Sequence, residues 1–503
     1  MSIPARAQVP LEPTDIPAGY GGFEHMLIDG EWRPGRADAV LADRDPFTGE
    51  VLVEMRQASA QDVDDAYRAA AAAQPAWAAK LPADRAALLR RAVAIMAGRR
   101  EEIVDWLIRE SGSTRIKALL EWEFTIAMTH EASTFPARAH GYVVPTDVGG
   151  KEGHVYRQPV GVVGMISPWN FPLHLSNRSI TPALALGNTA VIKPASDTPV
   201  TGGLLLAKIY EEAGLPPGVL NVVVGAGNAI GEQFVLHPTP RVISFTGSTE
   251  VGKHIAEMAA SGPMLKRVAL ELGGNCPSVV LDDANVALAV ETAIYGKFLH
   301  QGQICMATNR FIVDAKVHDE FVDRFVHRVR SLAVGNPRDP VTVIGPLIND
   351  SQLKRLMKLI EQARAEGARQ LEGGEPKGLV LPPHVFVDVK NDMAIAQNEL
   401  FGPVATIIKV QGEDEALEAA NDTPYGLSAS VITRDLDRGR QFALRIQAGM
   451  THVNDSPVHD LPTSPFGGEK NSGIGRYNGE WAIEEFTTVH WISTQHIPIL
   501  YPF

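Results

Sequence analysis

Strand and helix patterns alternate along this chain from about residue 160 almost to its end, and this alternation limits the folds that the chain can adopt. The short apolar runs VGVVGMI, TAVIKP, VLNVVVG and RVISFTG read as buried strands. Between them lie the helical patterns SITPALAL, GGLLLAKIYEEAG and AIGEQFVLH. Strands separated by helices of this length pair in parallel. We therefore expect an α/β fold with a Rossmann-like parallel sheet.

A second alternation follows the first. It runs through a helix at 286–299, a strand at 310–313 and a helix at 318–332, and it resumes from Val404 to Val453. Two consecutive α/β units fit this pattern, with a charged surface helix near 352–365. Two β-rich runs around Gly149-Gly150 predict a hairpin ahead of the first unit. Near the N-terminus, Pro75 is expected to end or kink an alanine-rich helix.

The composition excludes several classes of partner and site. The chain has 46 Lys and Arg against 59 Asp and Glu, a net charge of −13, which argues against a nucleic-acid or anionic-membrane binder. Two cysteines are too few for a disulfide framework. They also lack the ligand spacing of a zinc site, so we expect no metal. Residues 1–22 have no apolar run of signal-peptide type, and we expect a cytoplasmic protein.

Three residues could carry chemistry. Cys305, in HQGQICMATN, follows a glycine-containing helix end, where a thiol can be exposed and its thiolate favoured; the alternative is a small buried apolar residue. Asn170, in SPWNFP, follows a predicted strand and could donate to an oxyanion, or it could only form a turn. Glu271, in LELGGN, ends an apolar strand and is either a semi-buried base with a raised pKa or a solvent-exposed residue. Cys276 suits a buried apolar role.

Three strand ends also suit a nucleotide. GAGNAIG, from Gly225, lacks the usual dinucleotide spacing and is weak evidence alone. FTGSTEVG places Ser248 at a helix start, where phosphate binds readily. Lys193 comes at the end of a third strand.

These motifs together resemble the NAD(P)-dependent aldehyde dehydrogenase superfamily over nearly the whole chain. Seven of them occur in the family's order and spacing: SPWNFP, KPAS, FTGSTEVG, LELGGN, GQIC, NELFGPV and PFGGEKNSGIGR. Further segments, NFPLHLSNRS, HVNDSPVHDLPTSPFGG and QHIPILYPF, look like the benzaldehyde and vanillin dehydrogenase branch. Each motif alone is modest evidence, but the occurrence of all seven together makes the resemblance specific.

The resemblance implies a mechanism and a set of site residues. The Cys305 thiolate attacks an aldehyde, Asn170 holds the oxyanion, hydride passes to NAD or NADP, and Glu271 activates water to hydrolyse the thioester. The implied cofactor-binding residues are Ser167, Trp169, Lys193, Ser196, Gly225, Phe245, Gly247, Ser248, Glu399 and Phe401. The implied substrate-pocket residues are Phe171, Arg178, Ile304, Met306, Val458 and Phe466.

Two departures from the common family pattern bear on specificity. Ser196 stands where NAD-preferring relatives commonly have glutamate, which removes repulsion toward a 2′-phosphate, so we expect NADP to be at least accepted despite the adjacent Asp197. Arg178-Ser179 replaces the Trp-Lys of many relatives. Arg178 could face a carboxylate-bearing substrate, as in semialdehyde dehydrogenases, or make a structural ion pair. The branch-specific segments favour an aromatic aldehyde.

The resemblance also implies a domain organisation and a homo-oligomer. The expected NAD(P)-binding domain is 1–139 and 160–272, the catalytic domain is 273–475, and 140–159 with 476–503 form an oligomerisation domain of a homodimer or homotetramer. Two other functions compete. A CoA-acylating relative would generally lack Glu271, and a binding or structural protein on this fold would be expected to lose Cys305, Asn170 or Glu271.

Overall fold

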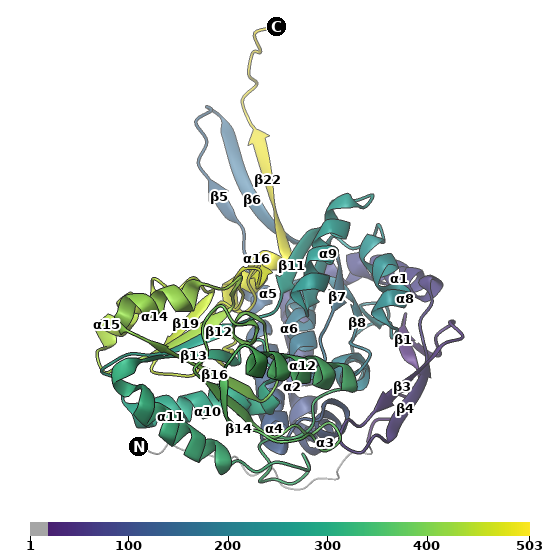
Figure 1. The fold of residues 1–503 in the computed structure, drawn as a ribbon. Helices are drawn as coiled ribbons and strands as arrows, with labels where there is room; N and C mark the ends of the chain where they lie inside the picture. Colours follow the sequence, from purple (N-terminus) through teal and green to yellow (C-terminus); the bar gives the residue numbers. More distant parts are fainter. Residues whose placement is uncertain (1–18) are drawn as a thin grey trace.

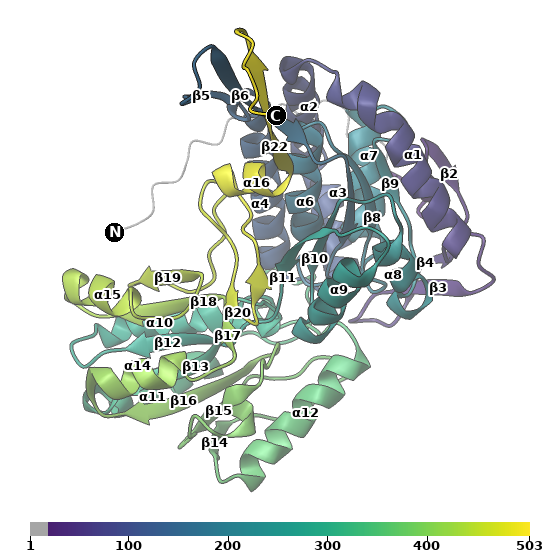
Figure 2. The ribbon, with the colours of Figure 1, turned by 90° about the horizontal axis from the view of Figure 1, so that it is seen from above.

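Two β-sheets, each flanked by helices, make up the body of the molecule, and a thin β-ribbon projects from it (Figures 1 and 2). This architecture is seen in a computed structural model that describes residues 19–503. The first 18 residues of the expected cofactor-binding domain, with most of the N-terminal segment 1–22, lie outside the described residues. The α/β expectation is confirmed.

The first sheet has six strands in the order β21-β11-β10-β7-β8-β9. Its parallel strands are β7 (Val162–Ile166), β8 (Thr189–Lys193), β9 (Leu220–Val222), β10 (Val242–Thr246) and β11 (Arg267–Glu271), and β21 (Gly473–Ile474) adds an antiparallel edge. The chain runs outward from β7 to β9 and then returns to the other side of β7 with β10. Ligands of open α/β sheets bind at this reversal, beyond the carboxyl ends of β7 and β10.

Helices cover both faces of this sheet because their apolar stripes must be buried against it. They are α1 (Ala60–Ala78), α2 (Pro82–Gly98), α3 (Arg100–Ser111), α4 (Arg115–Ala132), α6 (Pro172–Ala185), α7 (Leu205–Glu212), α8 (Gly227–Leu236) and α9 (Thr249–Ser261). The sequence predicts that Pro75 ends or kinks α1, but Pro75 does not end the helix, which continues to Ala78. Pro75 deprives only the carbonyl four residues earlier of its partner, and Ala71 is exposed, so water can bond that carbonyl.

The second sheet has seven strands in the order β14-β15-β16-β13-β12-β18-β19. Its strands are β12 (Cys276–Val280), β13 (Thr308–Asp314), β14 (Arg369–Glu372), β15 (His384–Val387), β16 (Val404–Val410), β18 (Ser428–Ile432) and β19 (Met450–Val453). Its main helices are α10 (Val286–Phe298), α11 (Ala315–Arg330), α12 (Asp350–Ala365), α14 (Gly412–Asn421) and α15 (Leu436–Ala443). The chain passes directly from β11 of the first sheet to β12 of the second sheet. The carboxyl end of β11 therefore lies next to the start of β12.

A three-stranded ribbon extends from the body (Figure 1). It is formed by β5 (Tyr142–Val144), β6 (Lys151–Pro159) and β22 (Thr487–Gln495), with β6 in the centre, so segments more than 300 residues apart lie side by side. The expected hairpin is confirmed. Between residues 19 and 503, no helix has the length and apolarity needed to span a bilayer.

Candidate functional site

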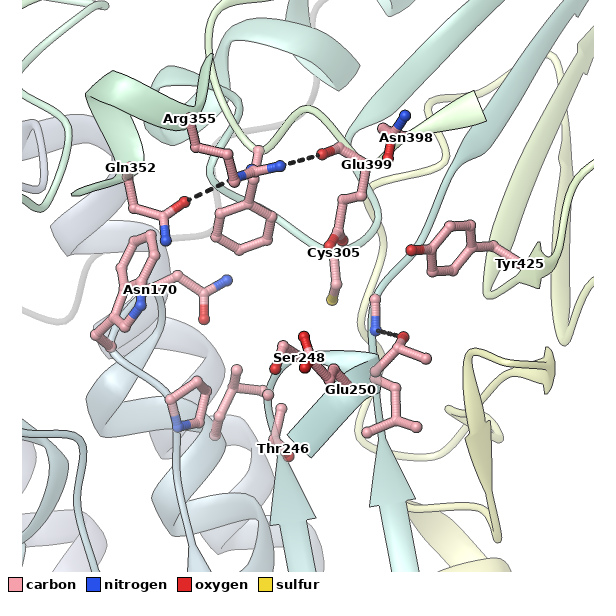
Figure 3. A pocket seen from close by; sticks show the side chains of 18 residues that line it. Asn170, Thr246, Ser248, Glu250, Cys305, Gln352, Arg355, Asn398, Glu399 and Tyr425 are labelled. Carbon is pink, nitrogen blue, oxygen red and sulfur yellow. Dashed lines mark hydrogen bonds between the residues drawn. The ribbon is translucent and has the colours of Figure 1, made fainter. Parts of the chain in front are cut away.

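A cavity of about 380 Å³ opens at the carboxyl ends of the first sheet, at the reversal point (Figure 3). Its wall includes residues 168–170 after β7, residues 246–250 at the β10–α9 junction, and Leu272 and Gly273 after β11. The second sheet contributes Cys305 and residues around 399–401. Seven residues singled out in the sequence therefore share one cavity: Trp169, Asn170, Gly247, Ser248, Cys305, Glu399 and Phe401.

Cys305 lies on the turn that leads into β13, and its thiol points into the cavity (Figure 3). The preceding turn has a left-handed backbone at His300, Gln301 and Gly302. Only glycine fits at position 302, where φ is +74° and a Cβ would come within 2.3 Å of the Gly402 carbonyl oxygen. The tight turn holds the thiol at a fixed point rather than on a mobile loop.

The electrostatics of Cys305 correct the expectation of a favoured thiolate. Burial raises its pKa, and the nearby Glu399 carboxylate raises it further, whereas the Arg178 guanidinium acts in the opposite direction. These surroundings favour the thiol over the thiolate. The Cys276 thiol is less accessible to solvent and reagents, because the residue is 1% exposed and its Sγ donates a hydrogen bond to the Cys305 carbonyl oxygen.

Asn170 points its amide toward Cys305 from the other side of the cavity (Figure 3). The residue is buried, and its Nδ2 donates to the Gln303 carbonyl oxygen at 2.9 Å, two residues before the thiol. A side-chain N–H held beside a nucleophile can donate a hydrogen bond to a substrate oxygen on which negative charge develops.

Glu271 ends β11 and is 2% exposed, so it is not the solvent-exposed residue that the sequence also allowed. It does not line the main cavity, but the chain after it passes close to Cys305, since a Cβ on Gly274 would meet the Cys305 carbonyl oxygen at 2.1 Å. Within residues 19–503 neither carboxylate oxygen has a hydrogen-bond partner. Burial raises the pKa of Glu271 to about 8 and outweighs the opposing charges of Arg178 and Arg476. The expected raised pKa is confirmed.

Glu399 is a second carboxylate of the site, and it is partly exposed. Its Oε1 accepts from the Gly274 N–H at 2.8 Å, and burial raises its pKa to about 7. Arg355 of α12 donates to the backbone carbonyls of Glu399 and Leu400 at 2.8 Å and holds this segment (Figure 3). The main cavity-lining residues that the sequence reasoning missed are Thr246, Glu250, Gln352, Arg355, Asn398 and Tyr425.

The β10–α9 junction fits the phosphates of a dinucleotide. Ser248 is the N-cap residue of α9, and within the described chain its side chain bonds no first-turn N–H group. These N–H groups, which a helix leaves unpaired, therefore lie at the cavity wall, where an anion could accept from them. Gly247 is tightly enclosed, since a Cβ there would meet the Phe245 ring at 2.5 Å.

Phe245, another expected cofactor residue, lies in β10 and is buried in an apolar cluster outside the cavity wall. The remaining expected cofactor residues lie around the ends of β7, β8 and β9, also outside the main cavity wall. Burial lowers the pKa of Lys193 to about 8, and its Nζ donates to the carbonyls of Pro194 and Gly225 at 3.2 Å. Ser167 Oγ is buried and has no partner in the described residues. Ser196 lines a different cavity, of about 360 Å³. An orphaned hydroxyl and a buried lysine at strand ends are compatible with a ribose and phosphate ligand.

None of the expected substrate residues lines the main cavity. Apart from Arg178, they belong to the large buried apolar cluster against which Cys305 packs. They are Phe171, Ile304, Met306, Val458 and Phe466. Arg178 is 1% exposed, and its NH1 pairs with Asp460 at 3.2 Å while its guanidinium lies 4.1 Å from the centre of the Phe466 ring. Of the two roles that the sequence allowed for Arg178, the ion pair is therefore the one present. Phe466 also lines a third cavity, of about 390 Å³, with Asp460 and the histidines His452 and His459.

Comparison with known proteins identifies the relatives of this chain. The model of the aldehyde dehydrogenase family matches residues 32–492. A vanillin dehydrogenase of Corynebacterium glutamicum is 53% identical over 475 residues, covering 94% of this chain and 98% of that protein. A benzaldehyde dehydrogenase of Bacillus subtilis is 47% identical over 484 residues, covering 96% and 99%. The crystal structure of an NAD-dependent benzaldehyde dehydrogenase from Corynebacterium glutamicum superposes with a TM-score of 0.88 at 50% identity, covering 95% of this chain and 98% of that one.

Proposed function

The chain belongs to the aldehyde dehydrogenase family, and from this premise we propose that it oxidises an aromatic aldehyde to the carboxylic acid with NAD or NADP as hydride acceptor. The observation that carries the proposal is the meeting of Cys305 and Asn170 in one cavity, with Cys305 packed against a large buried apolar cluster. The named relatives that act on vanillin and benzaldehyde support the aromatic class.

In the proposed reaction Cys305 is the nucleophile. The thiol first releases its proton to water in the cavity. The resulting thiolate adds to the aldehyde carbon, and the Asn170 amide donates to the oxygen that gains negative charge. When bound, NAD(P)⁺ supplies the acceptor for the hydride that leaves this carbon. Loss of the hydride leaves a thioester on Cys305. Glu271, whose ionised form accepts a proton, then activates the water that releases the carboxylic acid.

Residues at the strand ends of the first sheet would hold the cofactor. The α9 N-terminus at Ser248 would bind the pyrophosphate, Lys193 and Ser196 the adenine ribose, and Glu399 with Phe401 the nicotinamide ribose and ring. The serine at 196 places no carboxylate against a 2′-phosphate, which supports use of NADP as well as NAD. Lys193 is bonded to two carbonyls and would have to exchange one of them for a phosphate oxygen.

Two observations favour an aromatic substrate over a carboxylate-bearing one. An aromatic ring is stabilised by burial against apolar side chains, and Cys305 packs against the buried apolar cluster that contains its chain neighbours Ile304 and Met306. A substrate carboxylate needs an available cation, but Arg178 is already paired with Asp460 inside the protein. The semialdehyde alternative is therefore the weaker one.

The test is a panel of aromatic, aliphatic and acidic aldehydes, each assayed with NAD and with NADP. Aromatic aldehydes are expected to have the highest kcat/KM. Cys305→Ala should abolish oxidation and retain cofactor binding, and iodoacetamide should label Cys305 ahead of the buried Cys276. Highest kcat/KM for an acidic aldehyde would overturn the substrate class, and full activity of Cys305→Ala would overturn the mechanism.

The ribbon supports the proposal of a homodimer or homotetramer. β5 and β22 are edge strands, and their exposed apolar side chains include Tyr142, Val143, Val489 and Trp491. Light scattering at micromolar concentration tests it, and a monomer would contradict it. The expected domain limits and the cytoplasmic location remain predictions.

A further inference from the structure

A buried ion pair on α4 touches the segment that carries Asn170. Lys117 and Glu121 are both 0% exposed, and Lys117 Nζ lies 2.5 Å from Glu121 Oε2. Neither residue lines the main cavity. Two charges are expensive to bury unless they are paired and hydrogen-bonded. The further bonds that these two charges make are therefore informative.

The lysine bonds the backbone of the oxyanion residue itself. Lys117 Nζ donates to the Asn170 carbonyl oxygen at 2.6 Å, and the ammonium lies 4.2 Å from the centre of the Phe171 ring. On its other side, Asn170 Nδ2 donates to the Gln303 carbonyl oxygen at 2.9 Å. Asn170 is thus held by its backbone from α4 and by its side chain from the Cys305 turn.

The glutamate caps the helix that follows. The N-cap residue of α6 is Phe171, which has no side-chain acceptor for the first N–H groups. Glu121 supplies that acceptor from α4, because its Oε1 accepts from the N–H groups of Leu173 at 2.9 Å and His174 at 3.1 Å. One carboxylate therefore fixes both the lysine and the start of α6.

We propose that Lys117 and Glu121 are positioning residues for the reaction, which set the Asn170 amide at the distance from Cys305 that oxyanion stabilisation requires. This inference rests on the proposed role of Asn170. The pair acts from outside the cavity, through the Asn170 backbone and the α6 N-terminus. A donor that is displaced slightly loses most of its effect, and an error of about 1 Å can reduce the rate of a reaction by about 100-fold.

A double-mutant cycle between Lys117→Met and Asn170→Ala tests the proposal in the full-length enzyme. In the wild-type background Lys117→Met should lower kcat by about 10- to 100-fold, with little change in the affinity for NAD or NADP. In the Asn170→Ala background the same change should cost less than about twofold, because the donor that it positions is already gone. A merely structural defect would cost the same in both backgrounds.

Removal of one partner alone strands a buried charge and can prevent folding. Lys117→Met/Glu121→Gln removes both charges and keeps a side-chain oxygen for the α6 N–H groups, so it is the second variant for the same cycle. The control is Arg324→Met, which removes an exposed i,i+4 pair with Glu320 on α11 and should leave kcat unchanged.

The outcomes separate the inference from the function on which it rests. Equal loss in both backgrounds, or no loss from either variant of the pair, overturns the positioning role. If Asn170→Ala by itself leaves kcat unchanged, the proposed oxyanion role of Asn170 fails instead.

Discussion

The two carboxylates of the site, Glu271 and Glu399, differ in their exposure and in their surroundings, since Glu271 is buried and Glu399 is partly exposed. Burial raises the pKa of Glu271 to about 8 and that of Glu399 to about 7. Glu399 accepts from the Gly274 N–H, while neither oxygen of Glu271 has a hydrogen-bond partner in the described residues. An N–H donor stabilises the ionised form and suits a binding group, whereas a carboxylate without one keeps its lone pairs for a proton.

The largest expected effect comes from Glu271→Gln. It should lower steady-state turnover by about 10²- to 10⁴-fold, the usual contribution of a general base, because the thioester can no longer be hydrolysed efficiently. A pre-steady-state burst of reduced cofactor, close to one per active site, should remain. Stopped-flow absorbance measures the burst, and mass spectrometry should detect the acyl group on Cys305.

Glu399→Gln is the matched carboxylate change and should act on the earlier step. Loss of a charge-assisted hydrogen bond to the nicotinamide ribose corresponds to about 10- to 100-fold in the rate of the burst. No acyl-enzyme should accumulate. If Glu399→Gln traps the acyl-enzyme and Glu271→Gln eliminates the burst, the two assignments are reversed.

The pH dependence of thioester hydrolysis sharpens the comparison further. Glu271 acts as a base only when ionised, so with a pKa of about 8 the hydrolysis rate should rise about tenfold from pH 7 to pH 9. Single-turnover hydrolysis of the acyl-enzyme measures this rate directly. The slow residual hydrolysis in Glu271→Gln should lack this rise, and a rise of the same size there would assign the base elsewhere.

The smallest expected effect comes from Asp460→Asn. The Asp460 carboxylate raises the pKa of Glu271 and is not among the groups that shift the pKa of Glu399. Its neutralisation should therefore move the midpoint of the hydrolysis profile to lower pH. Asp319→Asn, at an exposed ion pair, is the control and should leave the midpoint in place. A shift to higher pH in Asp460→Asn would contradict this electrostatic account.

Much of the site could be predicted from short stretches of sequence, because such stretches indicate where a strand ends and where a helix begins. The alternation after residue 160 predicted the strands β7 and β10, and the residues after them, such as Asn170 and Ser248, line the cavity. Gln352 and Arg355 could not be found in this way. Their helix, α12, has the charged pattern of a surface helix, and that pattern is the same whether one end of the helix faces solvent or a cavity.

What the sequence by itself determined is the order of strands and helices, the family and the chemical types at the strand ends. What only the tertiary structure decided is the environment of each group. Arg178 pairs with Asp460, 282 residues away, and burial together with the nearby Glu399 raises the pKa of the Cys305 thiol. Periodicity records which face of an element is buried, but a pKa depends on the charges and donors that packing brings within a few ångströms. Those neighbours come from distant segments, so no local pattern contains them.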